Sequence, residues 1–154
     1  MPWHLAQINV ARFIAPQDDP ANADFMAALD HVNAMADAAP GFVWRLVGEG
    51  SDATDLVPDA ADPNLLANMS VWTDAESLRA FVYQQPDHLA VMRRRRDWFE
   101  KMDFFMALWW VPAGHVPTLA EGMAKIAHLA AHGPSPEAFT FQTIAAPPSS
   151  ASAG

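Results

Sequence analysis

The hydrophobic residues of this chain recur with two different periods, and the changes between them predict a series of strands and helices. Apolar and polar positions alternate in short segments, as in half-buried strands, whereas other segments repeat every three to four residues, as in amphipathic helices. Strands are predicted at residues 3–14, 42–47, 65–72, 104–111 and 138–143, and helices at 22–38, from 74 to the Gln85-Pro86 break, at 87–102 and from 118 to 132. This order is typical of an α+β, ferredoxin-like antiparallel sheet with helices on one face.

Caps and loops set the boundaries of this arrangement. Thr73 to Glu76 and Thr118 to Glu121 match the capping box, in which a hydroxyl accepts a hydrogen bond from a free helix amide. The Gly, Asp and Pro content of Gly48 to Asn64 predicts a long loop. We therefore expect a single domain at residues 1–143, followed by a flexible Pro/Ser/Ala-rich tail at 144–154.

The predicted strands carry apolar side chains on both faces, so both faces of the sheet need a cover. Helices packed on one side would leave the other as an unusually large exposed apolar patch. A second copy of the chain could bury that patch, and we therefore expect a homodimer.

Charge and composition exclude several partners. Nine basic against eighteen acidic residues give a net charge of −9, which argues against nucleic acid as the main partner. The run Arg93 to Arg96 does not change this, because consecutive helix residues point in different directions. The chain has no Cys and no apolar run near the ~20 residues of a membrane span. We expect a soluble protein, with the cytoplasm as the default compartment.

The helix predicted at 87–102 places two polar groups on its apolar face. His88 and Arg95 are in line there with Met92, Trp98 and Phe99. A buried charge needs a partner, water or a ligand. We therefore predict a pocket in which His88 and Arg95 are catalytic and the other three side chains bind ligand. The alternative is a hydrogen-bonded packing histidine beside an arginine in an intramolecular salt bridge.

Polar side chains also interrupt the predicted strands. Asn9 and Asn68 are candidate catalytic groups that could orient a small ligand, with Gln7 and Ser70 beside them, although cross-strand hydrogen bonding is an equally good explanation. Arg45 could bind a carboxylate of a substrate or of a partner subunit.

Two tryptophans and three histidines allow further interpretations. Trp72 and Trp109 could stack on a planar ligand or belong to the core. His128 and His132 have the i, i+4 spacing of a metal site, with His115 as a possible third ligand, although surface histidines are the alternative. The sequence contains no Gly-rich phosphate loop, dinucleotide fingerprint or nucleophile elbow.

Several segments together resemble an uncharacterised bacterial domain-of-unknown-function family. These segments are GFVWRL (41–46), SVW (70–72), LRAFVY (78–83), His88 with RRRRDWF (93–99), LWWVPAGHVPTLAEG (108–122) and GPSPEAFTF (133–141). That family resembles the dimeric α/β-barrel superfamily, which includes the antibiotic-biosynthesis-type monooxygenases. The middle segments are also similar to part of spheroidene monooxygenase, a haem-containing enzyme that modifies carotenoids.

The resemblance implies the fold and dimerisation more strongly than an activity, because this superfamily has many functions. It allows either no cofactor or a haem. A haem would be non-covalent, since no CxxCH motif is present, with His88 on the iron, Met92, Trp98, Phe99 and Met102 around the porphyrin and Arg95 near a propionate.

Two functions from different classes follow from the sequence. The first is a monooxygenase-like enzyme that acts on a small hydrophobic molecule between sheet and helices, with Arg45 and Arg95 as anion anchors. The second is a non-catalytic dimeric protein that binds a ligand or a partner, in which His88 and Arg95 complete a structural network.

Overall fold

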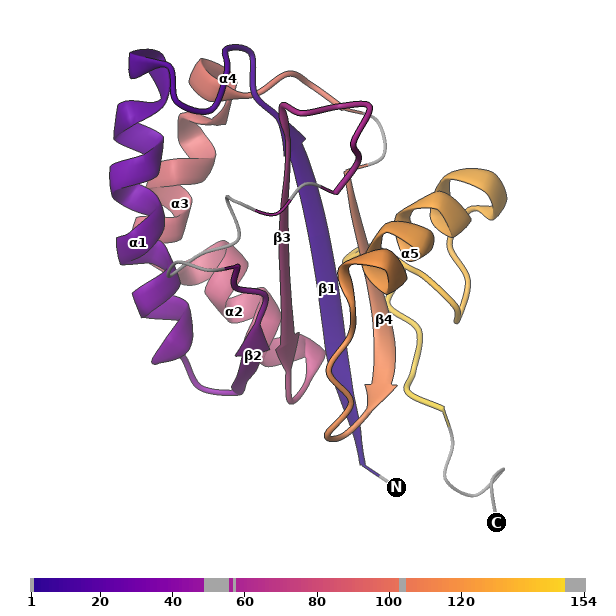
Figure 1. The fold of residues 1–154 in the computed structure, drawn as a ribbon. Coiled ribbons are helices and arrows are strands. Elements are labelled where there is room, and N and C mark those ends of the chain that lie inside the picture. Colours follow the sequence, from indigo (N-terminus) through magenta and orange to yellow (C-terminus); the bar gives the residue numbers. More distant parts are fainter. Residues whose placement is uncertain (1, 49–55, 57, 103–104, 149–154) are drawn as a thin grey trace.

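A four-stranded antiparallel sheet with the strand order β2-β3-β1-β4 forms the centre of the computed structural model, which describes residues 2–48, 56, 58–102 and 105–148 (Figure 1). The strands are β1 (Trp3–Arg12), β2 (Phe42–Arg45), β3 (Leu65–Trp72) and β4 (Met106–Pro112). The helices are η1 (Pro20–Asn22), α1 (Ala23–Asp37), α2 (Ala75–Gln84), α3 (Pro86–Arg93), α4 (Arg95–Trp98) and α5 (Leu119–His132). The ferredoxin-like α+β prediction is confirmed.

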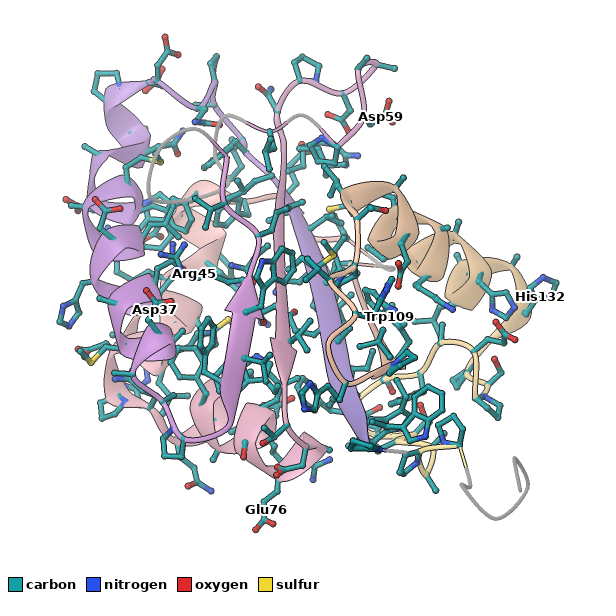
Figure 2. The ribbon with its side chains drawn as sticks, turned by 60° about the horizontal axis from the view of Figure 1, so that its bottom comes forward. Asp37, Arg45, Asp59, Glu76, Trp109 and His132 are labelled. Atoms are coloured by element: carbon teal, nitrogen blue, oxygen red, sulfur yellow. The ribbon has the colours of Figure 1, made fainter. Side chains whose placement is uncertain are left out.

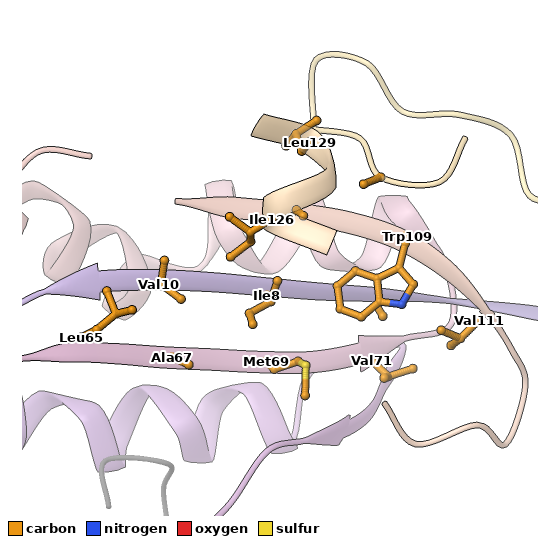
Figure 3. Close-up of a cluster of buried hydrophobic side chains, with 13 residues drawn as sticks. Ile8, Val10, Leu65, Ala67, Met69, Val71, Trp109, Val111, Ile126 and Leu129 are labelled. Atoms are coloured by element: carbon orange, nitrogen blue, oxygen red, sulfur yellow. The ribbon is translucent and has the colours of Figure 1, made fainter. Parts of the chain in front are cut away.

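One face of the sheet packs against α5, and its buried side chains form one apolar cluster. Gly122 lies so close to this face that a Cβ atom there would stand 2.7 Å from Ile8 Cδ1 and 2.9 Å from Met69 Sδ. Figure 3 shows Ile126 and Leu129 of α5 against the strand residues. The buried members of this cluster are Ala6, Ile8, Val10, Leu65, Ala67, Met69, Val71, Ala107, Trp109, Val111, Ile126, Leu129 and Ala138.

The opposite face packs against the helices α1 to α4 and carries two separate apolar clusters. One cluster lies toward α2 and the C-terminal segment and is formed by Leu5, Ala36, Trp72, Leu78, Leu108 and Phe139. The other lies toward α4 and is formed by Phe13, Phe25, Leu66 and Trp98. The prediction of helices on one face therefore holds for α1 to α4 but not for α5. The helix α5 covers the sheet face that we expected a second subunit to cover. Dimerisation therefore remains a prediction.

The helix predicted at 87–102 is wrong in its second half. The helix α3 ends at Arg93, the four-residue α4 follows, and the backbone is extended at Phe99. Beyond this point the chain pairs with the end of β1: Phe99 forms a bridge with Phe13, and the Glu100 amide donates to the Arg12 carbonyl. Pairing with a distant strand has replaced the local helical preference.

Other boundaries differ by smaller amounts. The cap of α2 is Asp74 rather than Thr73, and its carboxylate accepts from the Ser77 amide at 2.7 Å. The last predicted strand is reduced to a bridge between Phe139 and Leu108. Ile144 and Ala145 pack against the domain, so the start of the predicted tail is docked. The middle of the predicted long loop (49–55 and 57), Phe104 and the tail from 149 lie outside the described residues.

Candidate functional site

A row of four polar side chains crosses the sheet face that packs against α1 to α4, between the two apolar clusters of that face. We call Gln7, Asn9, Asn68 and Ser70 the polar belt. The register of β1 against β3 creates it, because Gln7 lies opposite Ser70 and Asn9 lies opposite Asn68. Side chains at alternate positions share a face, so all four point toward the helices. The structure thus brings together polar residues that the sequence places about 60 positions apart.

Hydrogen bonds join the polar belt into one network. Gln7 Nε2 donates to Asn68 Oδ1 at 2.9 Å and to Ser70 Oγ at 2.8 Å. Asn9 Nδ2 donates to Gln7 Oε1 at 3.1 Å. Ser70 Oγ also accepts from the indole nitrogen of Trp72 at 2.8 Å. The network holds the two asparagines in fixed positions at the centre of the sheet.

Solvent reaches only part of the polar belt. Gln7 and Ser70 are buried, with 6% and 7% of their surface exposed, whereas Asn9 and Asn68 are half-buried although they lie on the two inner strands. Within the described chain, the side-chain oxygen Oδ1 of Asn9 and the side-chain nitrogen Nδ2 of Asn68 make no hydrogen bond. The two asparagines therefore present one acceptor and one donor to a small molecule.

Arg45 lies at the edge of this face, next to Ser70 in the register. Its Nε donates to Asp37 Oδ1 of α1 at 2.8 Å, and Figure 2 shows the two side chains together. Strict alternation along β2 would place Arg45 and Phe42 on opposite faces of the sheet. A bulge between Phe42 and Trp44 instead puts both on one face, because it inserts one unpaired residue. The predicted anion anchor thus already binds a carboxylate.

His88 is half-buried on α3 and takes part in local hydrogen bonds. Its Nδ1 lies 2.9 Å from the Val82 carbonyl, and its ring centroid lies 5.2 Å from that of Phe81, which in turn packs on Trp72. Burial lowers the pKa of His88 below its ordinary value of 6.5, although the Val82 hydrogen bond opposes the shift. The imidazole is therefore neutral near pH 7, and with Nδ1 protonated its Nε2 has a free lone pair.

Arg95 does not lie beside His88 in a common pocket. The break at Arg94 turns Arg95 outward, where it is exposed, so the prediction that it faces the apolar interior is wrong. Trp98 and Phe99, expected to line the pocket, pack in the cluster with Phe25, at centroid distances of 5.4 and 4.9 Å. Met92 is half-buried on α3. Trp98 and Phe99 thus form core packing rather than a binding surface.

The two candidate tryptophans lie on opposite faces of the sheet. Trp72 is 1% exposed and adjoins the polar belt through Ser70. Trp109 belongs to the α5 face, and its Nε1 donates to Glu121 Oε2 at 2.9 Å. Burial raises the pKa of Glu121, but hydrogen bonds from His115 and Trp109 outweigh it and leave that pKa below its ordinary value. Glu121 thus links α5 to β4 and is not a free acid.

The structure does not assemble the predicted metal and haem sites. His128 and His132 lie together, with ring centroids 4.6 Å apart, but His115 is paired with Glu121 at 2.8 Å. Among the described residues, no three His, Asp or Glu side chains form a group that could hold a metal. For haem, His88 Nε2 has the right chemistry, but the aromatic side chains expected around the porphyrin pack on one another instead. The described residues do not fit the group.

Sequence reasoning missed two residues of α1 that face this side of the sheet. Asp37 forms the ion pair with Arg45, and Asn33 is 7% exposed. The available signal was an asparagine in line with Phe25, Leu29 and Ala36 on the apolar stripe of the helix.

Two surface hollows are lined by described residues alone. One of about 380 Å³ lies by the loop before α1 and includes Asp18 and Met26, and one of about 410 Å³ lies by the start of α2 and includes Pro40 and Phe81. Neither includes His88 or a residue of the polar belt.

Comparisons with solved structures find proteins of similar fold. SnoaB from Streptomyces nogalater, described as a cofactor-independent oxygenase, is 18% identical with a TM-score of 0.47, covering 73% of this chain and 95% of its own. A protein from Chloroflexus aurantiacus described as a putative antibiotic biosynthesis monooxygenase is 20% identical with a TM-score of 0.48, covering 74% and 97%. At these values the similarity carries no information about activity.

Sequence comparisons place the chain in a family. A search of curated proteins finds no significant match. In the described part of the chain, no helix has the length and apolar character needed to cross a membrane. The model of the family described as "Domain of unknown function (DUF3291)" matches residues 4–153, and the chain therefore belongs to this family.

Proposed function

We propose that the polar belt binds a small, largely apolar molecule through an oxygen function and supports a monooxygenase-like reaction on it. The observation that carries the proposal is the pair Asn9 and Asn68, partly exposed at the centre of this face and each with one unused hydrogen-bonding group. The apolar clusters on either side suit the apolar parts of the ligand. The belt itself contains no charged residue, so a neutral ligand fits it best.

The reaction that suits these groups needs no cofactor. A carbon acid loses a proton from a methylene group next to a carbonyl, and the Asn68 amide donates to the enolate oxygen that forms. Oxygen then accepts electrons from the carbanion: one oxygen atom forms the new carbon–oxygen bond, and the other leaves as water with the two hydrogens of the methylene group. The methylene group thus becomes a carbonyl group, and each molecule of oxygen consumed yields one molecule of water. His88, neutral near pH 7, is the proposed base.

Oxygen uptake with anthrone, a ketone that is also a carbon acid, tests this proposal. The wild-type protein should accelerate formation of the quinone, and Asn68→Ala should reduce the rate by roughly 10²-fold, the usual effect of losing one donor to a developing oxyanion. Asn9→Ala should reduce it less, because Asn9 offers an acceptor.

Gln142→Ala is the matched control, since Gln142 is an exposed carboxamide away from the polar belt. It should leave oxygen uptake unchanged. Equal rates in the wild type and Asn68→Ala, or no acceleration by the wild type, would contradict the enzymatic proposal.

A non-catalytic ligand-binding protein is the second candidate function. Gln7 and Ser70 hold one another, as a structural network would. This candidate predicts binding of the same neutral molecules, weakened by Asn68→Ala, without oxygen uptake.

A further inference from the structure

We propose that a second copy of this chain binds at the end of the molecule where the loop before α1 lies beside α4. In this interface, exposed arginines of each copy enter an acidic hollow of the other. The interface goes beyond the proposed function, since none of its residues belongs to the polar belt.

Basic residues are concentrated in one short segment of the chain. Residues 93–101 contain five of the nine Lys and Arg and two of the eighteen Asp and Glu, so they carry a formal charge of +3 and the rest of the chain carries −12. The basic residues elsewhere are all paired: Arg12 with Asp62, Arg45 with Asp37, Arg79 with the Phe141 carbonyl and Lys125 with Glu137. By contrast, the exposed side chains of Arg93, Arg95 and Arg96 make no hydrogen bond or ion pair within the described chain. These three arginines are therefore available to a partner.

The hollow beside the start of α1 has the opposite charge. Its volume is about 380 Å³, and its lining residues are Gln17, Asp18, Asp19, Pro20, Ala23 and Met26. The lining thus combines two carboxylates with apolar side chains and contains no basic residue. Asp18 is exposed, and its carboxylate has no partner among the described residues. An arginine has an apolar stem and a charged planar end, so its side chain suits a hollow of this composition.

The arginines and the hollow lie side by side at one end of the molecule (Figure 1). Asp24, next in sequence to Ala23 of the hollow, accepts a hydrogen bond from Arg94 Nη1 at 3.1 Å. Arg95 and Arg96 follow directly after this contact. A surface that carries both a charged feature and its complement can pair with a copy of itself about a twofold axis, so that each contact occurs twice.

An exposed apolar side chain joins the two features. Ile14 is 59% exposed, the highest value among the large hydrophobic residues of the described chain. Its amide donates to the carbonyl of Trp98, the last residue of α4, at 2.9 Å. The loop after Ile14 is held against α1, since Asn22 Nδ2 donates to the Pro16 carbonyl at 2.8 Å. An apolar residue with charged groups around it is the usual composition of a protein interface.

The charge pattern favours a second copy over a polyanion such as an anionic membrane. A polyanion would attract the arginines but repel the acidic hollow beside them and the rest of the chain. A second copy provides a partner for both features. Exposed charge pairs each contribute little, so we expect a weak, salt-sensitive dimer with a Kd on the order of 0.1 mM.

Analytical ultracentrifugation of the full chain and of charge-reversed variants tests the proposal. The dimer should weaken about tenfold between low salt and about 0.5 M salt, because exposed charges are screened. The double variant Arg95→Glu, Arg96→Glu and the single variant Asp18→Arg should each raise the Kd about tenfold or more, since each brings like charges together. An equimolar mixture of these two variants should form a heterodimer about as tight as the wild-type dimer, because both twofold contacts then join opposite charges.

Glu76→Arg is the matched control for Asp18→Arg, because Glu76 is an exposed carboxylate of α2 at the opposite end of the molecule (Figures 1 and 2). It should leave the Kd unchanged, whereas Ile14→Ser should raise it several-fold. All these positions are exposed, so Tm should stay close to that of the wild type.

Three results would overturn the proposal. These are a wild type that stays monomeric at about 1 mM in low salt, a dimer that neither charge reversal weakens, and a mixture that does not pair. Flotation with vesicles of phosphatidylcholine and phosphatidylglycerol tests the membrane as the partner. A monomeric wild type that floats with these vesicles, and a double arginine variant that does not, would assign the arginines to an anionic membrane instead.

Discussion

The same four strands form both faces of the sheet, but the side chains on the two faces differ in polarity. The face under α5 is one continuous apolar cluster, with Met69 1% exposed at its centre. The face under α1 to α4 is divided by the polar belt, and Asn68, the neighbour of Met69 in sequence, is half-exposed there. A polar layer in a core contributes less stability than apolar packing. In the function proposed above, the first face maintains the fold and the second is the site at which the ligand would bind.

The largest loss of unfolding free energy should come from placing a polar side chain on the α5 face of the sheet. Met69→Asn loses the packed thioether and buries an unpaired carboxamide, which together cost about 3 kcal/mol or more of unfolding free energy. Urea unfolding measures this loss. A cost below about 1 kcal/mol would show that the α5 face tolerates polar groups and would remove the contrast.

Ser70→Ala tests whether the polar belt is a connected network. The change leaves the Gln7 amide and the Trp72 indole without their acceptor, so we expect a loss of about 1–3 kcal/mol. Ser70→Thr keeps the hydroxyl and is the matched control. Equal stability of the alanine variant and the wild type would mean that the two donors find other partners.

His88 should make stability depend on pH. Its folded pKa lies below the unfolded value near 6.5, so the unfolded chain binds the extra proton first. Its contribution is therefore complete above about pH 6.5 and decreases as the pH falls through the folded pKa. Comparing unfolding free energies from pH 5 to 8 in the wild type and His88→Gln measures this. If the unfolding free energies of the two proteins changed with pH in parallel, the burial assigned to His88 would be contradicted.

The smallest loss of unfolding free energy should come from breaking the ion pair of Asp37 and Arg45, at the edge of the face that carries the polar belt. Asp37 is 48% exposed, so Asp37→Asn should cost less than about 1 kcal/mol at low salt. The loss should shrink further in 1 M salt, where surface charges are screened. A larger, salt-independent loss would mean that Asp37 anchors α1 through more than charge.

Local patterns predicted the elements well where the local preference and the tertiary fold agree. The strand β3 has the predicted bounds, and Trp109 and Trp110 point to opposite faces as alternation requires. The end of α3 was not predictable, because four arginines are acceptable in a helix and the later pairing of Phe99 with Phe13 depends on a distant strand.

The candidate site was predictable in its members but not in its geometry. Polar residues in apolar strands identified Asn9 and Asn68, whereas their pairing depends on a register set by distant contacts. The sequence pattern placed Arg95 on the wrong face because it assumed one continuous helix, whereas α3 ends at Arg93. Asn33 was missed because an asparagine on an amphipathic helix becomes informative only when its burial is seen.

One spectrum tests the contrast between the two faces most directly. Trp72 and Trp109 are both buried and hydrogen-bonded through the indole nitrogen, but they lie on opposite faces. In a 15N-labelled sample under nitrogen, with indole signals assigned through Trp→Phe variants, 1,4-dihydroxynaphthalene should shift the Trp72 indole signal and leave that of Trp109 in place. A shift of Trp109 alone, or of neither signal, would contradict a binding site at the polar belt.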